Sequence, residues 1–137
     1  MAREVGDVLV FVHTNDAPSD PEWEKALELL RNRASSSGLR TLVYTAGGAP
    51  NAAQRARLNA VIGATKPPIA VLTSSPIARA AGTAISWFNP MFKVFGPDDV
   101  DNALDHLALR GIERTHAREA LLEMKRDLLA SPRAAAR

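Results

Sequence analysis

A chain of 137 residues is long enough for one domain, and because it contains no cysteine it can form neither disulfide bonds nor thiolate metal sites. Its formal net charge is only +2, with 17 basic residues interspersed among 15 acidic ones, and 5% of its residues are aromatic. Nucleic-acid binders usually show a one-sided basic stripe with aromatic residues, so this composition argues against a nucleic-acid partner.

The apolar stretches are all short. None approaches the roughly 18 residues of a membrane-spanning helix, and the run in "MAREVGDVLVFV" is too short for a signal peptide. We therefore expect a cytoplasmic protein with no membrane partner. The three histidines show no metal-ligand spacing, so we also expect no metal and no cofactor.

The first predicted strand is "DVLVFVHTN", residues 7–15. Its apolar run is continuous rather than alternating, which is typical of a parallel strand covered on both faces. A helix follows, because Ser19 and Glu22 have the spacing of a capping box and Pro21 suits a first helical turn.

The next two units repeat this pattern. A second strand is predicted over Leu39–Thr45, followed by a helix that Pro50 and Asn51 open and Gly63 ends. "PPIAVLTSS", residues 67–75, predicts the third strand. The helix after it takes Ser75 as its N-cap and Pro76 at its first position.

The remaining segments are a short fourth strand at residues 91–95, a helix within residues 96–109, a fifth helix over 112–130 and a frayed tail at 131–137. This β-α-β-α-β-α-β-α-α order predicts an α/β fold with a four-stranded, mainly parallel sheet and helices on both faces. We expect one α/β domain over residues 1–110. Residues 111–137 are then a C-terminal helix and tail, either part of that domain or a helix for a partner.

Ligands of open α/β sheets gather at the carboxyl ends of the strands. Gly47 and Gly48 follow the second strand, but "TAGGAPN" lacks the lysine of a phosphate-binding loop. We expect one of these two glycines to take a positive φ and turn the chain. The turn at Gly47 and Gly48 then has a structural role and also forms part of a surface that recognises a partner.

Other side chains at this edge allow a second hypothesis. His13 and Asp16 follow the first strand, and Ser74 follows the third. If these three converge, the protein is a small-ligand binder or a hydrolase. "LTSSP" is not a nucleophile elbow, and a serine before proline at a helix start is an ordinary cap.

Two apolar features are open to more than one interpretation. In "ISWFNP", Trp87 and Phe88 either pack on the core or expose one ring as an anchor for a partner. The fifth predicted helix has one apolar stripe, which covers the sheet of its own chain or forms a partner interface such as a homodimer. The stripe consists of Ala117, Leu121, Met124 and Leu128, widened by Leu122 and Leu129.

The sequence resembles the STAS-like domains, the group that includes bacterial anti-sigma-factor antagonists. The resemblance lies in the order of elements and in "VLVFVHTNDAP", "LVYTAGGAPNAAQRARLNAV" and "IAVLTSSPIARAAGTAISWFNPMFKVFGPDDVDNAL", which together cover about Val8 to Leu109. It implies a binding module controlled by phosphorylation of a serine or threonine at a strand–helix junction. The family's initial hairpin is expected to be absent or shortened here, and its Asp-Ser-Ser-Gly turn is replaced by "YTAGGAPN".

The leading hypothesis is therefore a non-catalytic, regulatory, protein-binding module. The expected binding edge consists of Thr45, Gly47, Gly48, Asn51, Ser74, Ser75 and Trp87. Thr45, Ser74 and Ser75 are the phosphorylation candidates, because a phosphate gains from the positive end of a helix dipole. A hydrolase or small-ligand binder, and a structural homodimer, remain as alternatives.

Overall fold

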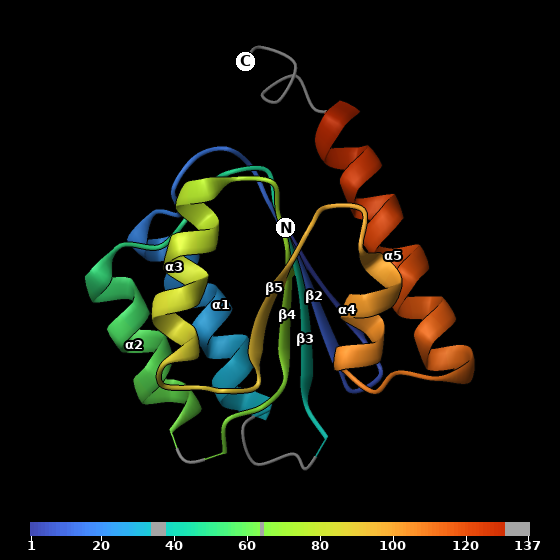
Figure 1. The fold of residues 1–137 in the computed structure, drawn as a ribbon, viewed down its shortest axis with the longest axis horizontal. Helices are drawn as coiled ribbons and strands as arrows, with labels where there is room; N and C mark the ends of the chain where they lie inside the picture. Colours follow the sequence, from blue (N-terminus) through green and yellow to red (C-terminus); the bar gives the residue numbers. More distant parts are fainter. Residues whose placement is uncertain (34–37, 64, 131–137) are drawn as a thin grey trace.

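The computed structural model describes residues 1–33, 38–63 and 65–130, so the predicted tail at 131–137 lies outside the described residues. The described chain forms an α/β fold, as expected, with one five-stranded mixed sheet and five helices (Figure 1). Along the chain the elements are β1 (Ala2–Val5), β2 (Val8–His13), α1 (Asp20–Arg33), β3 (Arg40–Thr45), α2 (Ala52–Ile62), β4 (Ile69–Leu72), α3 (Pro76–Ser86), β5 (Phe92–Phe95), α4 (Val100–His106) and α5 (Gly111–Ala130).

The expected strand number was wrong, because an N-terminal hairpin adds a fifth strand. β1 pairs antiparallel with β2, and Val5 lies opposite Val8 across the two-residue turn Gly6-Asp7. Gly6 has φ +57°, a conformation that glycine adopts at little cost. β1 is four residues long and partly exposed, so its sequence carries no apolar periodicity. The hairpin that was expected to be absent or shortened is therefore present, with a first strand of four residues.

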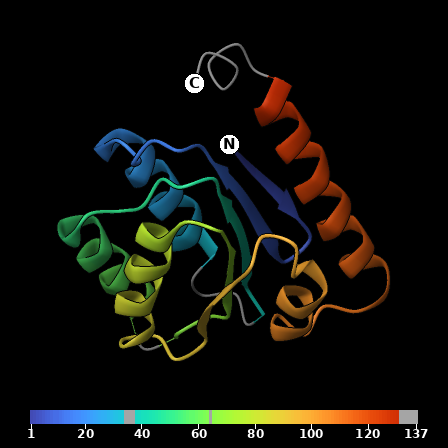
Figure 2. The ribbon, with the colours of Figure 1, turned by 45° about the horizontal axis from the view of Figure 1, so that its top comes forward.

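The strands lie in chain order, β1-β2-β3-β4-β5, and every pair from β2 to β5 is parallel. Parallel crossovers are right-handed, so successive crossovers between neighbouring strands leave their helices on the same face. Figures 1 and 2 show α1, α2 and α3 together on one face of the sheet and α4 and α5 on the other. The prediction of helices on both faces is confirmed.

Each face of the sheet has its own hydrophobic core. Along β2, Val8, Val10 and Val12 pack toward α4 and α5, whereas Leu9 and Phe11 pack toward α1–α3. This alternation explains the continuous apolar run in the sequence, since both faces of the strand are covered.

α5 covers the sheet of its own chain. Its apolar stripe is buried in the core that contains β2 and is at most 9% exposed, with Ala117, Ala120, Leu121, Met124 and Leu128 as its members. Leu122 and Leu129 point outward and are 44% and 73% exposed. Arg114 also pairs with Asp105 of α4 at 2.7 Å. The stripe that a homodimer would need is therefore already occupied.

Candidate functional site

The carboxyl ends of the parallel strands form one edge of the sheet, here called the rim: residues 13–16, 45–51, 73–75 and 96–98. The loops after β2 and β3 pack directly on one another. Gly48 donates its backbone N–H to the carbonyl of Thr14 at 2.9 Å, and Ala46 donates to the carbonyl of His13 at 3.1 Å. These hydrogen bonds hold the loops after β2 and β3 together, so this part of the rim is an ordered backbone surface.

The glycine pair is structural, although not for the expected reason. Neither Gly47 nor Gly48 has a positive φ, so the prediction of a left-handed corner was wrong. Gly48 is buried, and a Cβ built on it would lie 2.0 Å from the carbonyl oxygen of Asp16. The residue is needed because two backbones approach too closely for any side chain.

Thr45 is a buried structural residue, 5% exposed. Its hydroxyl donates to the carbonyl of Gly48 at 2.7 Å and accepts from the N–H of Gly47 at 3.2 Å. The buried Thr73 continues this network, since its hydroxyl donates to the carbonyl of Thr45 at 2.9 Å and accepts from the N–H of Ser75. A kinase cannot reach Thr45 in this fold, so we withdraw it as a phosphorylation candidate.

Of the polar side chains at the rim, Asn51 and Ser75 cap helices, whereas Ser74 is exposed. Asn51 caps α2 by accepting from the N–H of Gln54 at 2.8 Å, and Ser75 caps α3 by accepting from the N–H of Ala78 at 3.2 Å. Both residues were predicted to open their helices. Ser74 is exposed and precedes the cap of α3, so it is the accessible hydroxyl among the three phosphorylation candidates.

Gln54 was missed by the sequence reasoning, although Asn51 and Gln54 have capping-box spacing. It is 3% exposed and its side chain joins three segments. The amide oxygen accepts from the N–H of Asn51 at 3.0 Å, and the amide nitrogen donates to Pro18 and Asp20, both at 3.0 Å. Gln54 thus ties the start of α2 to the start of α1.

His13, Asp16 and Ser74 are not assembled into a catalytic group. His13 stacks on Phe11 with ring centroids 6.1 Å apart, on the α1–α3 face of the sheet. It lines two cavities, one shared with Asp16 at the rim, and neither includes Ser74 among its lining residues. Burial lowers the pKa of His13 to about 4, so the ring is neutral at neutral pH.

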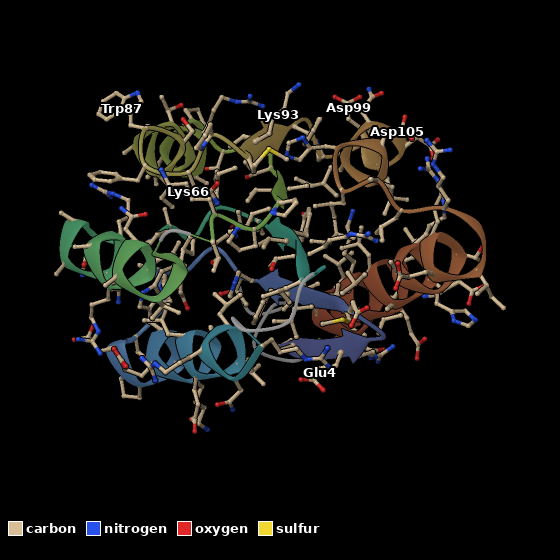
Figure 3. All side chains as sticks on the ribbon, turned by 90° about the horizontal axis from the view of Figure 1, so that it is seen from below. Glu4, Lys66, Trp87, Lys93, Asp99 and Asp105 are labelled. Carbon is tan, nitrogen blue, oxygen red and sulfur yellow. The ribbon has the colours of Figure 1, made fainter. Side chains whose placement is uncertain are left out.

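Trp87 does not belong to the rim. α3 begins there at Pro76 and ends at Ser86, and an eleven-residue helix is about 16 Å long. Figure 3, seen from below, shows Trp87 at the outside of α3, projecting from the molecule; Trp87 is 79% and Phe88 61% exposed. The interpretation that both rings pack on the core was wrong.

The turn after α3 explains this exposure. Asn89 is buried in place of the rings, at 1% exposure. Its side chain donates to the carbonyl of Pro67 at 2.9 Å and accepts from the N–H of Met91 at 3.0 Å. Because Asn89 holds the turn, Trp87 and Phe88 are turned outward, and Met91 beside them is 41% exposed. We call Trp87, Phe88 and Met91 the aromatic end.

A cavity of about 100 Å³ lies between the sheet and the helices α1–α3. Phe11, Val43 and Val71 from the strands and Ala26 and Ala81 from the helices are among its lining residues. It reaches the rim at His13 and Gly48. Sequence reasoning missed this cavity, because a void depends on how side chains from separate elements meet.

Comparisons with known proteins gave no relationship: no family model matches the chain, and neither a curated protein nor a solved structure does. Among the described residues, no helix is both long and apolar enough to cross a membrane. In that same part of the chain, no group of three or more histidine, aspartate or glutamate side chains could hold a metal ion. The function must therefore be argued from the geometry itself.

Proposed function

We propose that this chain is a cytoplasmic, STAS-like regulatory module that acts by binding another protein rather than by catalysis, and that the aromatic end is its binding surface. The single observation that carries the proposal is the outward projection of two adjacent large rings, Trp87 at 79% and Phe88 at 61% exposure. Tryptophan is enriched among the residues that dominate interface energies. Large aromatic side chains otherwise gain roughly 2–3 kcal/mol by burial, which makes two exposed neighbours unusual.

The backbone that carries the exposed rings is held in place, which favours binding. Asn89 fixes the turn through two hydrogen bonds to Pro67 and Met91, so the rings are presented by an ordered backbone. An anchor that is already positioned loses less conformational entropy when it is buried by a partner. The aromatic end therefore suits recognition better than a flexible loop would.

The STAS-like part of the proposal has one support in the fold, and phosphorylation at Ser74 is a separate proposal, because Ser74 follows β4 and not the β3 junction "YTAGGAPN" that corresponds to the family's turn. The initial hairpin that this resemblance calls for is present as β1 and β2, and the parallel strands follow in chain order. Ser74 stands exposed just before the N-cap of α3. A phosphate there would gain from the positive end of that helix, so Ser74 is the proposed phosphorylation site.

Photo-cross-linking in the native cell tests the binding surface. A benzophenone side chain at position 88 should cross-link to one protein partner, whereas the same group at position 112 should not. Ile112 is the matched control, because it is 74% exposed on α5, on the opposite face of the sheet. Trp87→Ala should reduce the cross-link at 88 at least tenfold, the loss expected of a hot-spot residue.

Two results would contradict the proposal. One is equal cross-linking from positions 88 and 112, and the other is an 88 cross-link that Trp87→Ala leaves unchanged. A cross-link between two copies of this chain would assign the surface to self-association instead. Intact-mass analysis of the native protein checks the switch separately: a phosphoform that Ser74→Ala removes is expected, and its absence under several growth conditions counts against regulation at Ser74.

A further inference from the structure

The cavity beneath α1–α3 is a feature that neither the aromatic end nor the rim explains. Protein interiors are packed to crystal-like density and hold few voids larger than a water molecule. Here a space of about 100 Å³ remains on the covered face of the central strands. Val43, in the middle of β3, stays partly exposed although helices cover its face of the sheet.

Short side chains create this space, not a helix that stands away from the sheet. α3 lies so close to β5 that a Cβ on Gly82 would be 2.4 Å from Cγ2 of Val94. Ala78 and Ala81 of the same helix and Ala26 of α1 line the cavity. Larger residues at these alanines would fill it, so the void follows from the sequence of three helix positions.

One polar group in the cavity wall lacks a partner. Thr41 of β3 lines the cavity and is 2% exposed, and its hydroxyl makes no hydrogen bond with the described residues. Most buried hydroxyls in proteins are paired, since an unpaired one destabilises the fold. A rotation of about 120° about the Cα–Cβ bond carries the threonine hydroxyl to a neighbouring staggered position, so Thr41 can present its hydroxyl to a bound molecule.

The cavity carries no charge to match a charged ligand. No aspartate, glutamate, lysine or arginine is among its lining residues, and His13 at its rim end is neutral at neutral pH because burial lowers its pKa to about 4. An ion placed here would lose its hydration without gaining a partner. Charge therefore restricts the occupant to neutral molecules.

The size of the cavity restricts the occupant further. An engineered apolar cavity of about 150 Å³ in another protein binds benzene, and the space here is smaller at about 100 Å³, so a single six-membered ring is the upper limit of its occupant. We propose that this cavity is a binding site for a neutral, mostly apolar small molecule of about the size of a benzene ring, whose single hydroxyl group hydrogen bonds to Thr41. The inference does not depend on a protein partner at the aromatic end.

Phenol and toluene are suitable probes, because they have similar shapes and differ in one hydroxyl group. Binding is measured on the full chain from NMR chemical shifts of the valine and alanine methyl groups that line the cavity. We expect both probes to bind the wild-type protein. In Thr41→Val, which keeps the shape of the side chain, the affinity for phenol relative to toluene should fall about tenfold, as for one lost hydrogen bond.

Filling the cavity supplies the steric test. Ala81→Leu and Ala78→Leu should each abolish binding of both probes, and the second variant serves if the first does not fold. Ala80→Leu is the control, because Ala80 is exposed on the same helix and should leave both affinities unchanged. Benzoate, the anionic relative, should bind neither the wild type nor the variants.

Four results would overturn the proposal. They are no binding of either probe up to its solubility limit, an unchanged phenol-to-toluene ratio in Thr41→Val, wild-type affinity in a folded cavity-filling variant, and benzoate binding as strong as phenol binding. None of these results bears on the cross-linking at position 88, so the experiments test this inference and the proposed function independently.

Discussion

Replacing Gly48 by alanine should remove a large part of the free energy of unfolding, because the new Cβ collides with two backbone carbonyl groups. The new Cβ would lie 2.0 Å from the carbonyl oxygen of Asp16 and 2.9 Å from that of Thr14, whereas ordinary contacts begin at 3.4 Å. Both contacts are with backbone, so no side chain can rotate away. The loop after β2 has to retreat by more than an ångström.

The free-energy cost of this movement has two parts, lost hydrogen bonds and steric overpacking. It breaks the bond from Gly48 N–H to Thr14 and strains the bond from Thr45 to the Gly48 carbonyl. Two hydrogen bonds contribute about 1 kcal/mol each, and overpacking typically costs about 1–3 kcal/mol. We expect Gly48→Ala to lower the free energy of unfolding by about 3–5 kcal/mol and Tm by roughly 10–17 °C.

Urea denaturation followed by tryptophan fluorescence measures this loss, with Gly47→Ala as the matched control. The closest atom to a Cβ on Gly47 would be the side-chain oxygen of Asn15, at 3.0 Å, which can move, and the backbone Cα of Asn15 lies at an ordinary contact distance of 3.7 Å. Gly47→Ala should therefore cost less than about 1 kcal/mol. If the two variants differ by less than about 0.5 kcal/mol, the close-approach explanation of the glycine pair is refuted. Larger substitutions such as Gly48→Arg cannot probe binding at the rim, because they disrupt the fold.

Three further predictions concern other parts of the molecule. Folding lowers the pKa of His13 from 6.5 to about 4, so the native state binds fewer protons than the unfolded chain between these pH values. The free energy of unfolding should therefore be highest above pH 6.5 and fall toward pH 4 by at most about 3 kcal/mol, and by less because His13 is partly exposed. In urea titrations, His13→Gln should flatten this decline between pH 7 and 5. Gln54→Ala should cost about 2–3 kcal/mol by the same assay, because it removes three part-buried hydrogen bonds at the starts of α1 and α2, each worth about 1 kcal/mol, and an unchanged midpoint would contradict that role. A chain that ends at Leu109 should lose its cooperative thermal transition in circular dichroism, because it lacks the core residues Ala117, Leu121 and Met124 of α5. If that chain kept a cooperative transition and was a monomer in light scattering, α5 would be dispensable for folding.

Regular elements with strong apolar patterns could be predicted from the sequence. The run at Val8–His13 and the caps Ser19, Asn51 and Ser75 define local structure through short-range chemistry, and each lies where it was expected. β1 was missed because an exposed edge strand of four residues leaves no apolar pattern. Its one signal was Gly6-Asp7 between two valines, which is a hairpin sequence.

The chemistry of the rim could not be predicted, because it depends on distances between separate loops. The sequence places Thr45 and Ser74 alike at strand ends, but Thr45 is buried under Gly48 and Ser74 is exposed. His13 follows its strand as a catalytic base would, yet its ring stacks on Phe11 in a cavity that excludes Ser74. The cavity and the unpaired hydroxyl of Thr41 arise only when seven elements, β2 to β5 and α1 to α3, pack together.

The two ends of α3 set a geometric condition on regulation. Ser74 lies at the start of this helix and Trp87 at its end, about 16 Å of helix apart. A standard interface of about 800 Å² per partner is roughly 30 Å across, so a folded partner centred on Trp87 can reach Ser74, whereas a short peptide bound at the aromatic end cannot. Under the proposed switch, a phosphate on Ser74 would block a large partner directly. We expect Ser74→Glu to weaken the cross-link from position 88 if the partner is a folded domain; an unchanged cross-link would limit the contact to the aromatic end and leave Ser74 without a direct part in it.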